Sequence, residues 1–174
     1  KRLMTDQKVI LISGGSRGLG AALVERLLSH GHILATFSRS RTPFVEQMEG
    51  NAQVRDRFRH EPIDATDAKA VRSYVTDLYN RHHRLDVLLN NAGISMNRPT
   101  LTLAPDDWRR AVDINLNGLF YCCQQAGQRM TRDRSGVILN TASMYGIVAA
   151  PERAAYCASK AAVVALSKSL ALEW

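Results

Sequence analysis

Short apolar segments alternate along the chain with longer segments whose apolar residues recur at helical spacing. Val9–Ile12 is a short apolar run that ends in a stretch of serine and glycine, which is typical of a buried strand. From Leu19 to His30 the apolar residues recur every three or four positions, and Gly31 then supplies a stop signal. The pattern predicts a strand that leads directly into a helix.

The same alternation continues to the end of the chain. The expected strands lie at residues 33–37, 58–63, 86–90 and 137–140, and the expected helices at about 43–48, 66–81, 105–132 and 154–172. Pro105 suits a helix start because its missing N–H costs nothing there, and Asp106 and Asp107 face the positive end of the helix dipole. Thr66 and Asp67 can cap the helix that they open.

Strictly alternating helices and apolar strands, of which the strand at 58–63 is the weakest, indicate a parallel sheet covered by helices on both faces. The expected fold is therefore a doubly wound α/β (Rossmann) sheet, formed by a single domain over residues 1–174. No internal repeat, low-complexity tract or linker divides the sequence. In such a fold the ligand cleft lies at the carboxyl ends of the strands.

The composition is that of an ordinary globular protein, with 45% hydrophobic and 22% charged residues. No apolar run approaches the roughly 20 residues of a membrane span, and no secretory signal opens the sequence, so we expect a cytoplasmic protein with no membrane partner. The formal net charge of +7 fits either a plain basic surface or attraction to polyanionic small molecules and acidic proteins. The basic residues are scattered and carry no nucleic-acid-binding motif, so no nucleic acid partner is expected.

The cysteines and histidines argue against a metal site. The three cysteines include one adjacent pair and no CxxC motif, which disfavours a disulfide framework and favours small buried residues in a reducing compartment. None of the five histidines has a recognised metal-ligand spacing, and we expect all of them on the surface or in loops. The residues concerned are Cys122, Cys123, Cys157, His30, His32, His60, His82 and His83.

A glycine-rich loop, Ser13–Gly20, joins the first expected strand to the first expected helix. Its glycines allow a tight turn and a close approach of the backbone to a pyrophosphate, and the helix N-terminus adds free N–H groups and a positive dipole end. Glycine clusters also occur in plain turns, but this position between a strand and a helix favours dinucleotide binding. The candidate cofactor contacts in the loop are Gly14, Ser16, Arg17, Gly18, Leu19 and Gly20.

The end of the second expected strand favours NADP(H) over NAD(H). A cofactor with a free ribose 2′-hydroxyl usually needs an acidic residue about 20 positions beyond the glycine loop. The segment Ser38–Arg41 stands there instead and contains no aspartate or glutamate. The planar guanidinium of Arg39 can pair with a 2′-phosphate, and Arg17 is a second candidate. Solvated surface arginines are the alternative interpretation.

Five sequence features occur in a fixed order along the chain. They are the spacing Gly14-x-x-x-Gly18-x-Gly20, the segment Asn90–Gly93, Asn115, Ser143 and the motif Tyr156-x-x-x-Lys160. Each is weak alone, but the ordered set strongly resembles the short-chain dehydrogenase/reductase family, in its small single-domain branch. Within that family the chain is similar to 3-oxoacyl-carrier-protein reductases and related carbonyl reductases. The resemblance implies an NADP-dependent enzyme that transfers a hydride between nicotinamide and a carbonyl or secondary alcohol carbon.

Tyr156 and Lys160 are four residues apart and therefore share one face of the last expected helix. A tyrosine hydroxyl normally titrates near about pH 10, and an adjacent ammonium favours its ionised form. Tyr156 can then protonate a carbonyl oxygen as a general acid, or accept that proton in the reverse reaction. Ser143 follows the fifth expected strand, at the ligand cleft, where its hydroxyl can hydrogen-bond the substrate oxygen.

The resemblance assigns roles to further residues. It counts Tyr156 and Lys160 among the cofactor-binding residues, with Lys160 at the nicotinamide ribose. It also places Asn115 in a water-linked proton relay with Lys160. A hydrogen bond within the helix is the alternative for Asn115. The resemblance places Asp64 against the adenine amino group, and a turn or cap role is the alternative there. It also implies a segment that stabilises the central sheet and lines the cofactor, namely Asn91, Ala92 and Gly93.

Two features depart from the family pattern. Ser13 stands where the family commonly has threonine, and either hydroxyl can brace the turn. Family members usually continue for about half a domain more. We therefore expect that the chain lacks the family's C-terminal strands and substrate-covering segment, as a fragment, a processed chain or a chain with a disordered tail would. If these 174 residues were the whole protein, the sheet would end at an exposed edge and the activity of this piece would be in doubt.

The resemblance also implies a homodimer or homotetramer whose subunits pair through the helices at 105–132 and 154–172. Arg129, Arg132 and Arg134 lie near a helix end, where an acidic carrier protein is one candidate partner. Favourable pairing of cations with a helix C-terminus explains these arginines without any partner. The alternative function is a catalytically silent dinucleotide-binding sensor or scaffold, which has no need of the serine, tyrosine and lysine together.

Overall fold

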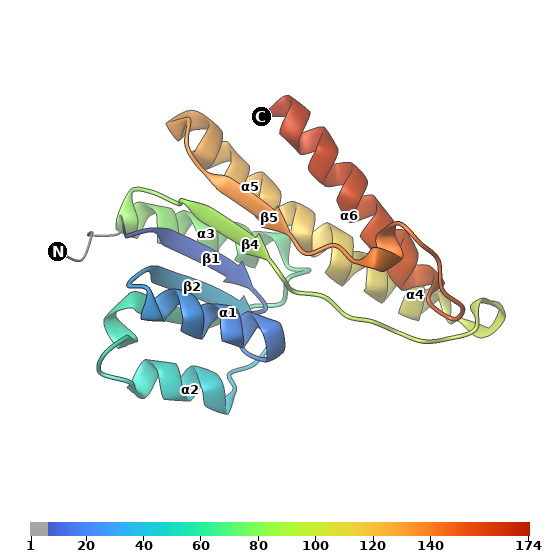
Figure 1. Cartoon of the computed structure of the whole chain (residues 1–174), viewed down its shortest axis with the longest axis horizontal. Coiled ribbons are helices and arrows are strands. Elements are labelled where there is room, and N and C mark those ends of the chain that lie inside the picture. Colours follow the sequence, from blue (N-terminus) through green and yellow to red (C-terminus); the bar gives the residue numbers. More distant parts are fainter. Residues whose placement is uncertain (1–6) are drawn as a thin grey trace.

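A computed structural model describes residues 7–174, and within them it contains a five-stranded parallel sheet with the strand order β3-β2-β1-β4-β5 (Figure 1). The strands are β1 (Val9–Ser13), β2 (Ile33–Ser38), β3 (Phe58–Pro62), β4 (Val87–Asn90) and β5 (Val137–Asn140). The helices are α1 (Gly18–Ser29), α2 (Pro43–Gly50), α3 (Ala68–His82), α4 (Pro105–Val112), α5 (Gly118–Asp133) and α6 (Ala154–Glu173). This arrangement confirms the expected doubly wound α/β fold.

Helices cover both faces of the sheet, and each face has its own hydrophobic core. Helices α1 and α2 pack on one face, and α3, α5 and α6 pack on the other (Figure 1). The central strand β1 is buried at every position, and its alternate side chains enter the two cores. Val9 and Leu11 belong to the core with α3 and α5, whereas Ile10 and Ile12 belong to the core with α1 and α2. An unbroken apolar run is therefore the pattern that this strand requires.

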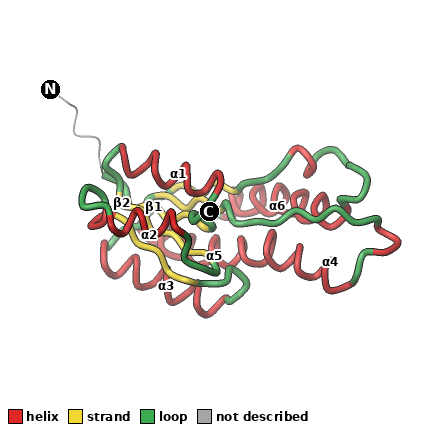
Figure 2. The backbone as a smooth tube through the Cα atoms, turned by 90° about the horizontal axis from the view of Figure 1, so that it is seen from below, coloured by secondary structure: helices red, strands yellow, loops and turns green. Residues whose placement is uncertain are grey.

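Parallel pairing brings the carboxyl ends of the strands to one edge of the sheet. Ser13 at the end of β1 pairs with Phe37 on one side and with Asn90 on the other, and Asn90 pairs with Asn140. The loops that follow these strands leave the sheet next to one another, which is where doubly wound folds bind ligands. Beyond the same edge, α4 and the first turns of α6 extend away from the sheet and pack together (Figure 2).

The helix expected at residues 105–132 is interrupted near its middle. Helix α4 ends at Val112, residues Asp113–Asn117 form a π-helical turn, and α5 begins at Gly118. Because the apolar spacing does not change across the π-turn, the sequence pattern predicted one continuous helix. Such turns are rare and often occur at functional sites. This one carries Asn115 at its centre.

One of the two expected helix caps is present. Asp67 caps α3, because its carboxylate accepts the N–H groups of Lys69 and Ala70 at 3.0 Å each. The expectation that Thr66 also caps this helix was wrong. The Thr66 hydroxyl donates instead to the Asp64 carboxylate at 2.8 Å.

Strand β5 and helix α6 form the border of the described fold on one side. Within residues 7–174, β5 pairs with β4 alone, and Val137 and Leu139 are about half exposed, as expected for an edge strand. By length and composition α6 could cross a membrane, contrary to the expectation that the sequence holds no such segment. Lys160 and Lys168 interrupt its apolar residues, so the sequence contains no continuous apolar run of this length. Core helices of globular proteins meet the same criteria, and Lys160 itself is buried against the rest of the fold.

Candidate active site

The glycine loop presents the N-terminus of α1 without a side-chain cap. Arg17 occupies the N-cap position and makes no capping bond, and the first turn of α1 contains no acidic residue. The N–H groups and the positive dipole end of this helix therefore remain available to an anion. Gly20 allows the turn to close tightly, because a Cβ atom there would lie 2.1 Å from the carbonyl oxygen of Gly14.

Hydrogen bonds join the glycine loop to the segment after β4. The Ser13 hydroxyl accepts the N–H groups of Asn91 and Ala92 at 3.1 and 3.2 Å. The Asn91 side-chain amide donates to the carbonyl oxygen of Gly14 at 3.1 Å. These bonds bring the two predicted cofactor segments together, and they show how a serine at position 13 braces the turn.

A cleft of about 450 Å³ opens at the carboxyl ends of the strands. Ligand sites for small molecules usually have about 300–1,000 Å³. Most of the predicted cofactor residues line this cleft: Gly14, Ser16, Arg17, Gly18, Arg39, Asp64, Asn91, Ala92 and Gly93. Leu19, Gly20, Tyr156 and Lys160 do not line it. Leu19 is 62% exposed beside the loop, and Gly20 shapes the turn from within.

The arginines around the cleft differ in how they are paired. Arg41 forms an ion pair with Glu49 on α2. The guanidinium groups of Arg17 and Arg39 have no hydrogen-bond or ion-pair partner among residues 7–174, and both side chains are exposed at the cleft. Arg39 is therefore free to bind an anionic group of a ligand, whereas Arg41 is already neutralised by a carboxylate.

Asp64 lies at the cleft but is occupied by its own turn. Its Oδ1 atom accepts the N–H group of Thr66 at 2.9 Å and the Thr66 hydroxyl at 2.8 Å. The turn role considered for this residue is therefore present in the structure. The side chain remains exposed, so its second oxygen is open to a ligand.

Helix α6 supplies Tyr156 and Lys160, one turn apart. Lys160 is buried, its Nζ atom donates to the carbonyl oxygen of Thr141 at 2.6 Å, and it lies 5.8 Å from the centre of the Tyr156 ring. Burial lowers the pKa of Lys160. The Tyr145 ring packs edge-on against the Tyr156 ring at 6.4 Å between centres. Tyr145 follows Ser143 by two residues, so the serine segment lies next to α6.

Ser143 stands at the start of the short 3₁₀ turn Met144–Gly146. Its hydroxyl oxygen accepts the N–H group of Tyr145 at 3.2 Å. Within the described part of the chain, the side chains of Ser143, Tyr156 and Lys160 form no hydrogen bonds with one another. The structure thus places the three groups on adjoining segments.

Asn115 in the π-helical turn connects the segment after β4 to helix α6. It is fully buried, its Oδ1 atom accepts the N–H group of Ile94 at 2.8 Å, and its Nδ2 atom donates to the carbonyl oxygen of Ile94 at 2.9 Å. The same Nδ2 atom lies 3.1 Å from the hydroxyl of Ser159, which donates to the carbonyl oxygen of Tyr156 at 2.8 Å. The side-chain contacts of Asn115 are therefore with other segments, not within its own helix.

Gly93 lies between the cofactor cleft and the candidate catalytic residues Asn115 and Lys160. A Cβ atom on Gly93 would lie 3.2 Å from Oδ1 of Asn115 and 3.6 Å from Nζ of Lys160. Gly93 itself lines the cleft. The amide of Asn115 and the ammonium of Lys160 are thus immediate neighbours of the cleft wall.

The expectation that every histidine lies on the surface or in a loop was wrong for His60. This residue belongs to β3 and is 6% exposed. Along β3, Phe58 and His60 face the interior because side chains two positions apart share one face of a strand. No group of three or more histidine, cysteine, aspartate or glutamate side chains in the described ranges is arranged to hold a metal ion.

The cysteines and the arginines of α5 are explained by packing. Cys122 and Cys123 are buried, as expected, and Cys157 is half-buried. Arg129 donates to the hydroxyl of Thr76 on α3 and to a backbone carbonyl of α5, both at 2.7 Å, and Arg132 lies 5.1 Å from the centre of the Tyr79 ring. These contacts account for both arginines without a carrier protein.

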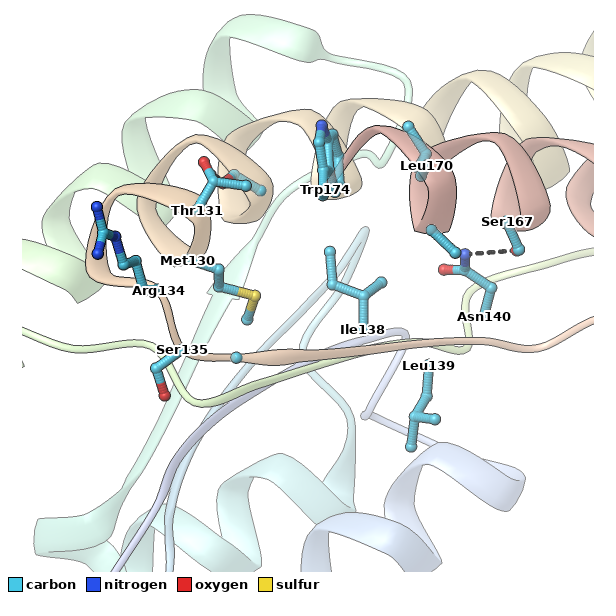
Figure 3. A pocket seen from close by; sticks show the side chains of 13 residues that line it. Met130, Thr131, Arg134, Ser135, Ile138, Leu139, Asn140, Ser167, Leu170 and Trp174 are labelled. Atoms are coloured by element: carbon cyan, nitrogen blue, oxygen red, sulfur yellow. Dashed lines mark hydrogen bonds between the residues drawn. The ribbon is translucent and has the colours of Figure 1, made fainter.

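A larger pocket of about 670 Å³ lies between α5, β5 and the end of α6. Met130, Ile138 and Trp174 point into it, and the side chain of Asn140 donates to the hydroxyl of Ser167 at its border (Figure 3). None of the residues predicted to bind a cofactor or to catalyse a reaction lines this pocket. The cofactor site is therefore assigned to the smaller cleft, which most of the predicted cofactor residues line, and Asn115 and Lys160 lie behind its wall at Gly93.

The doubly wound sheet, the glycine loop and the cleft at the carboxyl ends of the strands define a Rossmann-type α/β protein. Residues 8–174 match the family model of the short chain dehydrogenases, and the chain belongs to this family.

Comparisons with individual proteins agree with this family assignment. The chain is 35% identical over 172 residues to a D-threitol dehydrogenase of Mycolicibacterium smegmatis, covering 97% of this chain and 65% of that protein. It is 35% identical over 173 residues to the 3-oxoacyl-[acyl-carrier-protein] reductase FabG of Staphylococcus aureus, covering 98% of this chain and 70% of that protein.

Solved structures show the same relationship. A short-chain dehydrogenase from Streptomyces avermitilis superposes with a TM-score of 0.90 at 28% identity, covering 97% of this chain and 61% of that one. The structure of gox2181 superposes with a TM-score of 0.87 at 30% identity, covering 98% and 67%. The chain thus spans about two thirds of the length of the proteins that it matches.

Proposed function

We propose that this chain forms the cofactor-binding and catalytic part of an NADP(H)-dependent oxidoreductase, which transfers a hydride between nicotinamide and a carbonyl or secondary alcohol carbon. The observation that carries the proposal is the buried ammonium of Lys160, which lies next to the Tyr156 ring and close to Gly93 in the wall of the cleft. A buried cation beside a tyrosine at the border of a cleft is an arrangement suited to general acid–base chemistry.

The residues at the cleft fit a dinucleotide. The uncapped N-terminus of α1 suits a pyrophosphate, and the volume of the cleft is within the range of small-molecule sites. When bound, the nicotinamide ring supplies or accepts the hydride. The segment Asn91–Gly93 would line the cofactor, and Lys160 would hold the nicotinamide ribose through ammonium hydrogens that its bond to Thr141 leaves free.

The preference for NADP(H) rests on Arg39. Arg39 directly follows β2, its side chain lines the cleft and it has no partner within the described residues. The segment Ser38–Arg41 contains no acidic residue. Similar solved structures include ElxO with NADP bound and xylitol dehydrogenase bound to NAD⁺, so likeness alone does not choose between the two cofactors. An unpaired arginine at this position favours a ligand with a 2′-phosphate.

The proton transfer is assigned to Tyr156. In the reductive direction its hydroxyl gives a proton to the oxygen of the substrate carbonyl, and in the oxidative direction its phenolate takes that proton back. Lys160 places its ammonium 5.8 Å from the centre of the Tyr156 ring. The hydroxyl of Ser143 donates a hydrogen bond to the same substrate oxygen, and Asn115 holds the segment after β4 against α6 while this occurs.

We also propose a cytoplasmic homodimer or homotetramer. Two adjacent buried thiols, Cys122 and Cys123, fit a reducing compartment. Trp108 on α4 and Phe120 on α5 expose 41% and 37% of their surface, which favours a subunit interface on these helices. Light scattering that finds a monomer at all concentrations would contradict the assembly.

Direct titration of the 174-residue chain with NADPH and NADH, followed by fluorescence, tests the cofactor. We expect tighter binding of NADPH. Arg39→Ala should weaken NADPH binding by roughly 10- to 100-fold, the loss of a charge-assisted hydrogen bond, with little effect on NADH. Arg41→Ala is the matched control, since Arg41 is already paired with Glu49. Equal binding of both cofactors, or equal losses in both variants, would contradict the NADP(H) preference.

A further inference from the structure

His60 is a buried imidazole that contacts the end of the neighbouring strand. Its Nε2 atom lies 2.8 Å from the hydroxyl of Ser38, the last residue of β2. Its Nδ1 atom is buried and has no hydrogen-bond partner in the described structure. An apolar side chain would fill the same position without leaving a polar atom unpaired. The imidazole therefore contributes something other than packing.

The hydrogen bonds around Ser38 fix the protonation of this ring. The Ser38 hydroxyl has one hydrogen, which it donates to the carbonyl oxygen of Ser40 at 2.9 Å. The contact between Ser38 and His60 then requires Nε2 of the ring to carry the donated hydrogen. The other tautomer, or the imidazolium, would place an N–H group at Nδ1, where it would be buried without an acceptor. The arrangement therefore selects a neutral ring protonated at Nε2.

The Ser38 hydroxyl holds the turn that carries Arg39. Its bond to the carbonyl oxygen of Ser40 spans Arg39, so the two flanking residues are held together. The far end of the turn is also fixed, because the Thr42 hydroxyl donates to the carbonyl oxygen of Ser16 in the glycine loop at 2.8 Å. Arg39 thus extends from a short segment anchored at both ends, and its first anchor depends on His60.

We infer that His60 is a positioning residue for cofactor selection, which orients the Arg39 turn toward the 2′-phosphate through the Ser38 hydroxyl. This inference rests on the proposed preference for NADP(H). His60 makes no contact with the cofactor in this arrangement. Its ring is buried and acts through its contact with the Ser38 hydroxyl.

The charged groups around His60 agree with a neutral ring. Burial lowers its pKa, and the positive charge of Arg41 acts in the same direction, whereas the carboxylates of Glu49 and Glu61 act against it. Arg41 and Glu49 pair with each other, so their effects on the ring largely offset. The neutral tautomer is therefore available at physiological pH, as the hydrogen-bond pattern requires.

The test compares two replacements of His60 in the full chain. His60→Leu removes the donor, whereas His60→Gln places a side-chain amide N–H near the former Nε2 position. We expect His60→Leu to weaken NADPH binding by about two- to tenfold, the equivalent of one hydrogen bond, and to leave NADH binding unchanged. His60→Gln should retain most of the NADPH preference. Ser38→Ala, which removes the acceptor, should reproduce the effect of His60→Leu and add nothing to it in the double variant.

Nitrogen-15 chemical shifts of the imidazole provide a readout that needs no cofactor. We expect the shifts of a neutral ring protonated at Nε2. A ring protonated at Nδ1 would overturn the inference. So would equal losses of NADPH and NADH affinity in His60→Leu, which would indicate a purely structural role. If His60→Leu does not fold, Ser38→Ala alone decides.

The outcomes separate this inference from the proposed function. If the unmodified chain prefers NADPH, Arg39→Ala abolishes the preference and His60→Leu and Ser38→Ala leave it intact, the inference is wrong and the proposed function stands. If the unmodified chain shows no preference for NADPH, the cofactor proposal fails and the role of His60 fails with it.

Discussion

The ammonium nitrogen of Lys160 lies 5.8 Å from the centre of the Tyr156 ring, which is one turn earlier on the same helix. The Lys160 side chain is only 4% exposed, and burial lowers its pKa. The fold therefore keeps a cation where its environment disfavours charge. A buried cation such as Lys160 is more readily explained by function than by stability. Two predictions concern Tyr156 and Lys160.

The first prediction concerns Tyr156→Phe. The change removes the hydroxyl and keeps the ring, so its packing against Tyr145 is retained. In a form of the protein that turns over, steady-state rates should fall on the order of 10²- to 10⁴-fold, the usual contribution of a general acid or base. NADPH affinity should stay the same. Tyr79→Phe is the control, since the Tyr79 hydroxyl bonds to Asp133 on the surface far from the cleft. Undiminished turnover in Tyr156→Phe would exclude the proposed proton donor.

The second prediction concerns Lys160→Met. Because the folded state lowers the pKa of Lys160, removing the charge should raise the free energy of unfolding at neutral pH by roughly 0.5–2 kcal/mol, while NADPH binding weakens. The lysine in the unfolded chain titrates at about pH 10.4. The stability of the unmodified chain should therefore rise toward that pH, and the difference in stability between it and Lys160→Met should narrow. Urea unfolding at neutral pH and near about pH 10 measures both effects. A Lys160→Met chain that is less stable at both pH values would refute the argument.

The third prediction concerns the glycine loop. Gly20→Ala would place a Cβ atom 2.1 Å from the carbonyl oxygen of Gly14 and 2.7 Å from the side-chain amide of Asn91. The backbone must shift, so we expect a loss of stability of at least about 1–3 kcal/mol and a severe loss of dinucleotide binding. Gly50→Ala is the matched control, since a Cβ atom there meets nothing within 4 Å. Thermal unfolding and NADPH titration of both variants check the prediction, and equal stabilities would contradict the close packing at Gly20.

Much of the fold could be predicted from the sequence because its signals are local. The apolar run of β1 and the glycine loop specify the first strand, turn and helix without reference to distant residues. The interruption of the long helix at Asp113–Asn117 could not be predicted in this way. At this turn Asn115 contacts Ile94 and Ser159, which are distant in sequence and become its neighbours only in the folded chain.

The candidate site was predicted in part for the same reason. Motif residues such as Gly14 and Arg39 gather at the cleft as the sequence indicated. The supporting residues were missed, because they belong to no motif. Thr36 is fully buried in β2, where its hydroxyl accepts the N–H group of Gly15 at 2.9 Å and donates to a carbonyl oxygen of β1 at 2.7 Å. A polar residue within an otherwise apolar strand was the available signal for Thr36. His60 lacked this signal, because it lies between Arg59 and Glu61 in β3.

The fourth prediction concerns Asn115→Ala. The change leaves the N–H and carbonyl groups of the half-buried Ile94 without their side-chain partners, at a cost of up to about 1–3 kcal/mol for each group that stays unpaired. Chemical denaturation should show this loss, and hydrogen exchange of the Ile94 amide should accelerate. Asn117→Ala in the same π-helical turn is the control, because the Asn117 side chain bonds only to Asp113 near the surface. Equal effects of the two changes would contradict the linking role of Asn115.

The fifth prediction concerns the stability of the chain in mild acid. Because burial lowers the pKa of His60, the unfolded chain binds a proton near about pH 6.5 that the folded chain resists. The contribution of the neutral ring to the free energy of unfolding is therefore fully present above about pH 6.5 and is lost as the pH falls toward the pKa of His60 in the folded chain.

The His60→Gln variant has no titrating side chain at this position. The free energy of unfolding of the unmodified chain should fall relative to that of His60→Gln between about pH 8 and pH 5, by about 1.4 kcal/mol for each unit by which the pKa is lowered. The pKa of His82 is also lowered, but His82 is present in both proteins and its effect cancels in the difference. Parallel curves for the two proteins would show that the fold tolerates a charged ring at this position, and the requirement for a neutral His60 would then be abandoned.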